Sequence, residues 1–176
     1  MSSQPSPTNV LDFLHIVERL KKTKRTGWVH NDVRQPESIA DHMYRMSIMA
    51  MLIDDPQLKR DHCIKMCLVH DLAESIVGDI TPYQGISNQE KHLKEAQAME
   101  RLCELVKGSA ASEEMMALWQ EYEACETAEA RLVKDLDKFE MIVQALEYEQ
   151  NKFKHPQVQQ WVKALYARRA APTPNH

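Results

Sequence analysis

Apolar side chains recur at every fourth residue in the segment 56–77, and this spacing places them on one face of an α-helix. The stripe consists of Ile64, Leu68, Leu72 and Ile76. Such a stripe is typical of a helix that packs on a hydrophobic core. The chain also has only 4 Gly in 176 residues but 10 Met, a composition that favours helix over sheet. We therefore predict an all-α protein with one helix from about Pro56 to Val77.

The same periodicity predicts further helices along the chain. Their approximate ranges are 10–22, 37–53, 87–107, 113–124, 128–150 and 156–169. Ser87 to Glu90 form a capping-box pattern that opens one of them, and Gly108 ends it. Gly27 and Pro36 interrupt the helical pattern, so residues 26–36 are expected to form a loop. The expected architecture is one domain over residues 9–170, with a disordered tail at 1–8 and a flexible tail at 171–176.

Charge and cysteine content narrow the classes of function. The formal net charge is −4 and the pI is about 6.1, which gives no general electrostatic case for binding nucleic acid polymers or anionic membranes. No signal peptide or transmembrane segment is expected. The 4 Cys residues show no zinc-ribbon or disulfide pattern, so reduced, buried thiols are expected. This indicates a cytoplasmic protein, with nuclear access by diffusion left open.

Ionisable residues interrupt the apolar helical pattern at three places. His70, Asp71 and Glu74 lie close together before Gly78-Asp79, His42 lies in the apolar stretch 39–52, and Asp137 lies among apolar residues of the stretch 132–141. Residues three or four apart share a helix face, so Glu74 can face the same pocket as His70 and Asp71. Two imidazoles and two carboxylates (His42, His70, Asp71 and Asp137) suit Mn²⁺, Fe²⁺, Co²⁺, Zn²⁺ or Mg²⁺.

The order His, His-Asp, Asp resembles the HD-domain metal-dependent phosphohydrolases. Four segments resemble the 5′-deoxynucleotidase branch of that superfamily, the HD domain-containing protein 2 group. They are Arg25-Thr26-Gly27-Trp28, the run 37–42, the run 70–74 and Gly78-Asp79-Ile80. The resemblance covers about residues 9–150 and implies an HD-domain helical bundle of about six to seven helices. It also implies hydrolysis of a deoxyribonucleoside 5′-monophosphate and a homodimer.

The resemblance further implies roles for individual residues. Glu74 and Asp79 are the next carboxylates in reach, either as acid and base or as ligands of a second ion together with the Ile80 carbonyl. In the resembling family an arginine next to the tryptophan orients the phosphate. Here Gly27 occupies that adjacent place, so Arg25 is the candidate, with Lys24 and Arg34 as substitutes for the same task.

Several alternatives stay open at this point. The Trp28 ring either packs on the sugar or base and excludes a ribose 2′-hydroxyl, or fills the core. Glu121, Tyr122 and Glu123 either approach the base or are surface charges beside a core tyrosine. The metal cluster also fits enzymes that act on cyclic, triphosphate or alarmone nucleotides. A non-catalytic, metal-stabilised helical interaction module is the alternative to an enzyme.

Overall fold

A computed structural model describes residues 4–152, 155–161 and 164 of the chain. The chain divides into two compact units, Met1–Glu140 and Met141–His176. The first unit contains the helices that surround the hydrophobic core and most of α8. The second contains the end of α8 from Met141 to Lys152 and a helical turn at 156–161. The predicted helix 156–169 and the predicted tail 171–176 therefore lie partly or wholly outside the described residues.

Eight α-helices, two short 3-10 turns and the helical turn at 156–161 make up the regular structure of the described residues, and no strand is present among them. The α-helices are α1 (Pro7–Val17), α2 (Thr26–His30), α3 (Ile39–Met51), α4 (Arg60–Val69), α5 (Glu74–Val77), α6 (Asn88–Leu105), α7 (Ala110–Ala124) and α8 (Ala128–Lys152). The 3-10 turns are η1 (Glu18–Lys21) and η2 (Pro82–Gln84). The all-α prediction is thus confirmed. None of these helices combines the length and the apolar character that a membrane crossing needs.

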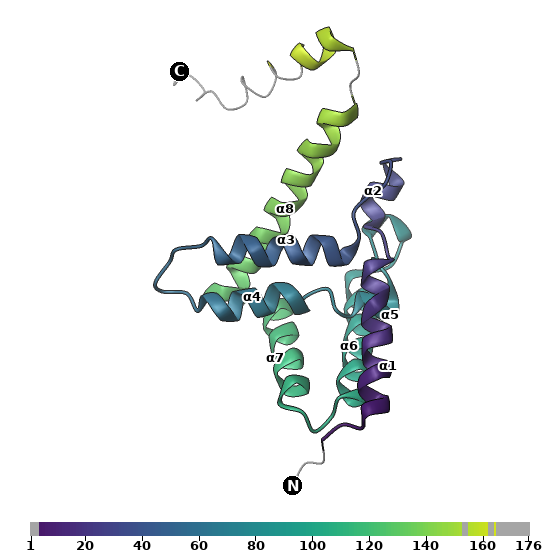
Figure 1. Cartoon of the computed structure of the whole chain (residues 1–176), viewed down its shortest axis with the longest axis vertical. Coiled ribbons are helices and arrows are strands. Elements are labelled where there is room, and N and C mark those ends of the chain that lie inside the picture. The colour runs from purple at the N-terminus through teal and green to yellow at the C-terminus, as the bar shows by residue number, and fades with distance from the viewer. Residues whose placement is uncertain (1–3, 153–154, 162–163, 165–176) are drawn as a thin grey trace. The chain divides into compact units, whose positions relative to one another are not determined.

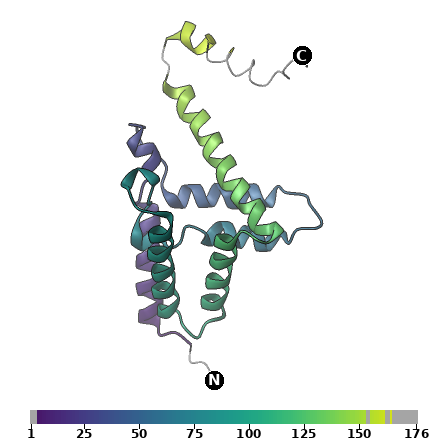
Figure 2. The same cartoon turned by 180° about the vertical axis from the view of Figure 1, so that it is seen from behind.

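Within the first unit, α3 and α4 run side by side, and α1 lies along α6 next to α5 (Figure 1). Seen from behind, α6 and α7 stand beside each other and run in opposite directions (Figure 2). Met46, Met66, Met99, Leu102 and Val133 are among the fully buried side chains of the core. The core therefore draws on α3, α4, α6 and α8, and two of these helices, α3 and α8, carry the candidate ligands His42 and Asp137.

The predicted helix from Pro56 to Val77 is wrong as one continuous element. It is divided into α4 and α5 by a turn at residues 70–73. In this turn the hydrogen bonds connect residues three apart, as in Leu72 N to Val69 O at 2.9 Å and Glu74 N to Asp71 O at 3.0 Å. Such bonds tighten the helix locally but do not change the direction of the chain. Apolar residues can therefore recur at every fourth position across the break. One member of the stripe, Leu68, is 49% exposed.

The expected loop 26–36 is also corrected, because residues 26–30 form the short helix α2. The first helix begins at Pro7, earlier than predicted, because Ser6 accepts a hydrogen bond from Asn9 N and caps it. Residues 7 and 8 of the predicted tail are therefore helical. Helix α1 leaves Leu11 and Leu14 about half exposed, at 55% and 52%, and turns Phe13, Ile16 and Val17 to the core.

Candidate active site

His70 caps α4 and is the first residue of the turn that separates α4 from α5. Its Nδ1 donates a hydrogen bond to the Cys67 carbonyl oxygen at 2.9 Å. With the proton on Nδ1, the lone pair of a neutral imidazole is on Nε2. The Nε2 atom of His70 is buried and makes no hydrogen bond, and it lies 3.2 Å from Oδ2 of Asp71. The turn thus presents one nitrogen and one carboxylate oxygen from adjacent residues.

His42 lies in the first turns of α3. That helix begins with a capping box in which the Ser38 side chain accepts from Asp41 N and the Asp41 carboxylate accepts from Ser38 N. The capping box fixes the start of the helix and thereby the position of His42, whose side chain is 0% exposed. His42 Nε2 lies 3.2 Å from Oδ1 of Asp137 on α8 and 3.9 Å from Oδ2 of Asp71.

These four side chains fit a divalent metal ion. Donor atoms of His42, His70 and Asp137 all lie within 4.8 Å of one another, and Asp71 adjoins both imidazoles. The Nε2 atoms of both His42 and His70 are buried without a hydrogen bond. Buried polar atoms normally have a partner, and two imidazole nitrogens beside two carboxylates match the mixed nitrogen and oxygen ligands of first-row divalent ions.

The electrostatics of the cluster agree with this donor set. Burial opposes the charged form of Asp71, but His70, Arg25 and His42 hold the pKa of its carboxyl well below the usual range. For His42, burial lowers the pKa, and the carboxylates of Asp137 and Glu140 more than offset this and raise it to about 9. The carboxylates around His42 thus favour a positive charge on its ring in the metal-free protein. A metal ion would compete with the proton that carries this charge.

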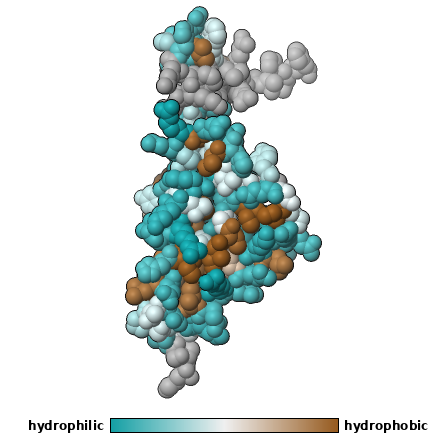
Figure 3. All heavy atoms as spheres, turned by 90° about the vertical axis from the view of Figure 1, so that its right-hand side faces the viewer, coloured by the Kyte–Doolittle hydropathy of each residue, from teal (hydrophilic) through white to brown (hydrophobic). Residues whose placement is uncertain are grey.

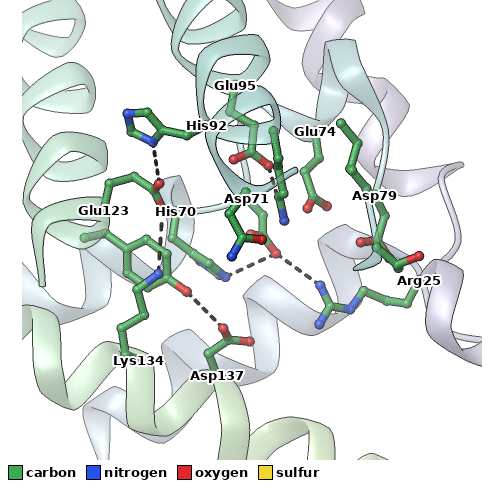
Figure 4. A pocket seen from close by; sticks show the side chains of 15 residues that line it. Arg25, His70, Asp71, Glu74, Asp79, His92, Glu95, Glu123, Lys134 and Asp137 are labelled. Atoms are coloured by element: carbon green, nitrogen blue, oxygen red, sulfur yellow. Dashed lines mark hydrogen bonds and ion pairs between the residues drawn. The ribbon is translucent and has the colours of Figure 1, made fainter. Parts of the chain in front are cut away.

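A cavity of about 410 Å³ opens in front of the cluster. Its lining is formed by Arg25, His70, Asp71, Glu74, Asp79, Ile80, Thr81, Asn88, Lys91, His92, Glu95, Tyr122, Glu123, Lys134 and Asp137. Arg25 enters from one side with Asp79, whereas His92, Glu123 and Lys134 lie on the other, with Asp71 between them (Figure 4). NH1 of Arg25 donates to Oδ2 of Asp71 at 3.3 Å. The cavity therefore combines the metal-ligand set with cationic side chains that suit an anionic ligand.

Glu74 and Asp79 both line this cavity, as does Ile80. Burial and the neighbouring carboxylates of Asp71 and Asp79 raise the pKa of Glu74 well above its usual value, and its Oε2 is buried without a hydrogen bond. Gly78 adopts a φ of 78°, a backbone angle that glycine reaches without strain, and it turns the chain from α5 into Asp79.

Asp79 connects the site to the short helix α2. Its Oδ2 accepts from Thr26 N at 2.5 Å, and its carbonyl oxygen accepts from Thr26 Oγ1 at 2.8 Å. One carboxylate oxygen of Asp79 is thus committed to the backbone of α2. This contact brings Arg25, the residue before α2, to the cavity.

Trp28 is half-buried on α2 and is not among the cavity-lining residues. Its Nε1 donates to Oε1 of Glu37 at 2.8 Å. Lys24 and Arg34, the alternatives to Arg25, are exposed and do not line the cavity either. The structure therefore brings together the predicted site residues except Trp28, and it selects Arg25 from the three basic candidates for a contact inside the cavity.

Several residues of the site were not predicted from the sequence. Tyr122 is the core tyrosine of the second alternative, since it is buried, but its contact with the metal-ligand set was not expected: its hydroxyl donates to Oδ2 of Asp137 at 2.9 Å. Lys134 lies with its amine 3.6 Å from the centroid of the Tyr122 ring. Lys91 and Lys134 add two cations to the lining. The signal was present for Lys134, which precedes Asp137 by three residues and so shares its face of α8.

Comparison with known proteins places this geometry in a family. The HD domain family model matches residues 17–174. The 5′-deoxynucleotidase HDDC2 of Xenopus laevis is 48% identical, over 92% of this chain and 88% of the relative, and that of Homo sapiens is 44% identical, over 92% and 87%.

Among solved structures, the HD domain-containing protein YGK1 is 38% identical, with a TM-score of 0.63, over 95% of this chain and 88% of that one. A 5′-deoxynucleotidase named YGK1 is known from Saccharomyces cerevisiae. The ordered motifs, the helical fold and these similarities agree, and the chain belongs to the HD domain family, in the branch whose members carry the name 5′-deoxynucleotidase.

Proposed function

We propose that this protein hydrolyses deoxyribonucleoside 5′-monophosphates to the deoxyribonucleoside and phosphate. The observation that carries the proposal is the joint position of His42, His70, Asp71 and Asp137 behind a cavity that Arg25 also lines. The names of relatives at 42–49% identity give the substrate class. A divalent cation and a cationic phosphate contact are the two requirements of such a reaction, and the lining provides groups for both.

The metal-ligand set would be His42, His70, Asp71 and Asp137. When bound there, a divalent ion supplies a Lewis acid that polarises the phosphate and makes the attacking water more acidic. Mn²⁺, Co²⁺, Mg²⁺, Fe²⁺ and Zn²⁺ are the candidate ions, because the ligands are two nitrogens and two carboxylates. Glu74, Asp79 and the Ile80 carbonyl are candidates for a second ion, since all three residues line the same cavity.

The chain's own residues account for orientation and for proton transfer. The Arg25 guanidinium would bind the phosphate oxygens. Glu74 is buried beside two other carboxylates, which raises its pKa well above the usual value and favours its protonated form. Water adds at phosphorus and would give one proton to the Asp79 carboxylate, the bond from phosphorus to the sugar 5′-oxygen breaks, and Glu74 would give its proton to that oxygen. Asp79 is the second carboxylate available for proton transfer on this side of the cavity.

Phosphate release from deoxyribonucleotides and ribonucleotides tests the function. Metal-stripped protein should release phosphate from deoxyribonucleoside 5′-monophosphates only after Mn²⁺, Co²⁺, Mg²⁺, Fe²⁺ or Zn²⁺ is added back. Asp71→Ala and Asp137→Ala should each abolish release. Asp135→Ala is the matched control, because Asp135 has a 78% exposed side chain on the same helix. A folded wild-type protein that releases no phosphate with any metal would refute the proposal.

Trp28 does not itself line the cavity, but it is proposed to disfavour ribonucleotides through the bulk of its ring on α2, the helix that follows Arg25. Its position three residues after Arg25 supports this assignment. Trp28→Ala should lower the deoxy-to-ribo preference in kcat/KM. Trp161→Ala, which removes a 62% exposed ring, is the control. An unchanged preference in Trp28→Ala would remove Trp28 from this role.

We also propose that the protein is a homodimer in the cytoplasm. Exposed apolar side chains support the dimer. On the face that carries α1, hydrophobic side chains gather in a band (Figure 3), and α1 itself exposes Leu11 and Leu14. Light scattering coupled to size exclusion would test the dimer.

Four free cysteines support a reducing compartment, which imaging of a tagged protein would test. The domain limits 9 and 170 stay predictions.

A further inference from the structure

Glu140 lies on the side of His42 that faces away from the cavity. Its carboxylate is 0% exposed, and its Oε2 accepts a hydrogen bond from His42 Nδ1 at 2.6 Å. We infer that Glu140 is a positioning residue for the metal site, which fixes the tautomer and the orientation of the His42 ring. The inference rests on the proposed metal-binding role of His42.

The chemistry of the imidazole ring supports this role. A neutral imidazole carries one proton, and a carboxylate at Nδ1 can only accept. The proton therefore stays on Nδ1, and the lone pair is on Nε2, the atom that faces Asp137 and Asp71 without a hydrogen bond. Metal-bound histidines commonly donate their second ring nitrogen to a carboxylate in this manner, which also makes the ligand nitrogen more basic.

Arg45 completes the arrangement from the same helix as His42. Its Nε donates to Oε1 of Glu140 at 2.7 Å, and its NH2 lies 2.5 Å from the same oxygen. Each oxygen of the buried carboxylate thus has its own donor, as a buried charge requires. Arg45 follows His42 by three residues on α3, and Glu140 follows Asp137 by three residues on α8. One turn of α3 thus carries the two side chains that contact one turn of α8.

A different reading would make Glu140 a metal ligand itself, because donor atoms of Glu37, His42 and Glu140 lie within 4.8 Å of one another. The hydrogen bonds argue against it. The two carboxylate oxygens of Glu140 already accept hydrogen bonds from His42 and Arg45. One carboxylate oxygen of Glu37 accepts a hydrogen bond from Trp28. Nδ1 of His42 is likewise engaged. The ring is therefore oriented with Nε2, and not Nδ1, as the nitrogen available for a metal ion.

The test is Mn²⁺ binding by the metal-stripped full-length protein, measured by calorimetry. Glu140→Gln keeps the size of the side chain but removes its charge, and it should weaken Mn²⁺ binding about 10- to 100-fold. Glu140→Asp keeps the charge and should recover part of the loss. Glu149→Gln removes an exposed carboxylate from the same helix and should bind Mn²⁺ as the wild type does. Equal affinity of folded Glu140→Gln and wild type would overturn the inference.

A measurement on the wild type remains decisive if Glu140→Gln does not fold. In the Zn²⁺-loaded protein, ¹⁵N NMR of the His42 ring should show a proton on Nδ1 and none on Nε2. A proton on Nε2 would contradict the assignment. The outcomes also separate the two proposals. If the wild type binds neither Mn²⁺ nor Zn²⁺, the proposed function fails, whereas metal binding that does not depend on Glu140 refutes only the positioning role.

Discussion

The hydroxyl of Tyr122 donates a hydrogen bond to Oδ2 of Asp137, at 2.9 Å, while Oδ1 of the same carboxylate faces His42. Tyr122 is also packed on the ring of His70, with centroids 4.9 Å apart. Burial and the Asp137 carboxylate raise the pKa of the Tyr122 hydroxyl, so it stays a proton donor. One side chain of α7 thus contacts two of the four candidate metal ligands.

Tyr122→Phe removes this donor and leaves the ring in place. We expect Mn²⁺ affinity to fall about tenfold, because partners of metal ligands typically contribute that much, while the fold is retained. Calorimetric titration with Mn²⁺ measures the effect. Tyr44→Phe is the matched control, since Tyr44 is 67% exposed. An affinity equal to that of the wild type would show that the hydrogen bond does not orient Asp137.

The sequence offered Lys24, Arg25 and Arg34 as candidates for the phosphate contact, and of these three only Arg25 lines the cavity. Arg25→Met should reduce kcat/KM for a deoxyribonucleoside 5′-monophosphate about 100-fold, because a charged contact to the reacting phosphate is lost. Lys24→Met and Arg34→Met should stay close to the wild type. Steady-state kinetics on the three variants decides the matter, and a large loss in either control variant would move the phosphate contact away from Arg25.

Metal removal should lower thermal stability, because an ion that binds only the folded state stabilises it by mass action. At a free Mn²⁺ concentration 100 times the Kd, the gain is about 2.7 kcal/mol, or about 5–10 °C in Tm for a protein of this size. Scanning calorimetry of chelator-treated protein with and without Mn²⁺ measures the shift. His70→Ala should show no shift, whereas His15→Ala, at an exposed position, should show the full one.

The cysteines should react in a defined order. Cys63, Cys67 and Cys103 are buried, whereas Cys125 is half-buried. Burial raises the pKa of Cys67 to about 12 and also raises the pKa values of Cys63 and Cys103. Since the thiolate is the reactive form, iodoacetamide at pH 8 should label Cys125 first. Mass spectrometry after short exposure locates the label, and early labelling of Cys67 would contradict the packing.

The helical periodicity predicted the fold class and most helices. Each helix buries one face, and the apolar residues of that face can be read from its own short segment of sequence. It could not predict the break at residues 70–73, because the bonds between residues three apart keep the chain on a similar helical path. The helical spacing of Leu11, Leu14, Val17 and Leu20 indicated one apolar face for the first helix, and it is only partly buried. Val17 and Leu20 pack in the core, whereas Leu11 and Leu14 are about half exposed.

The candidate site shows the same division. His70 and Asp71 could be identified because ionisable side chains within an apolar stretch are costly to bury unless they bind a partner or a ligand. The roles of Tyr122 and Glu140 could not be, since each depends on a partner in another helix. Glu140 is 98 residues from His42 in the chain. Its spacing of three from Asp137 was visible, but an exposed salt-bridge residue would show the same spacing.

The two hydrogen bonds between Thr26 and Asp79 join residues that are 53 positions apart, and the chain between them contains α3, α4 and α5. Because the donor in one bond is the Thr26 amide, hydrogen exchange at that amide reports whether the two ends of the segment are joined. Because these bonds join Asp79 to the first residue of α2, opening of the turn at residues 78–81 breaks a contact that holds α2 beside the cavity. The exchange rate of this one backbone proton would therefore report how often the contact at this side of the cavity opens.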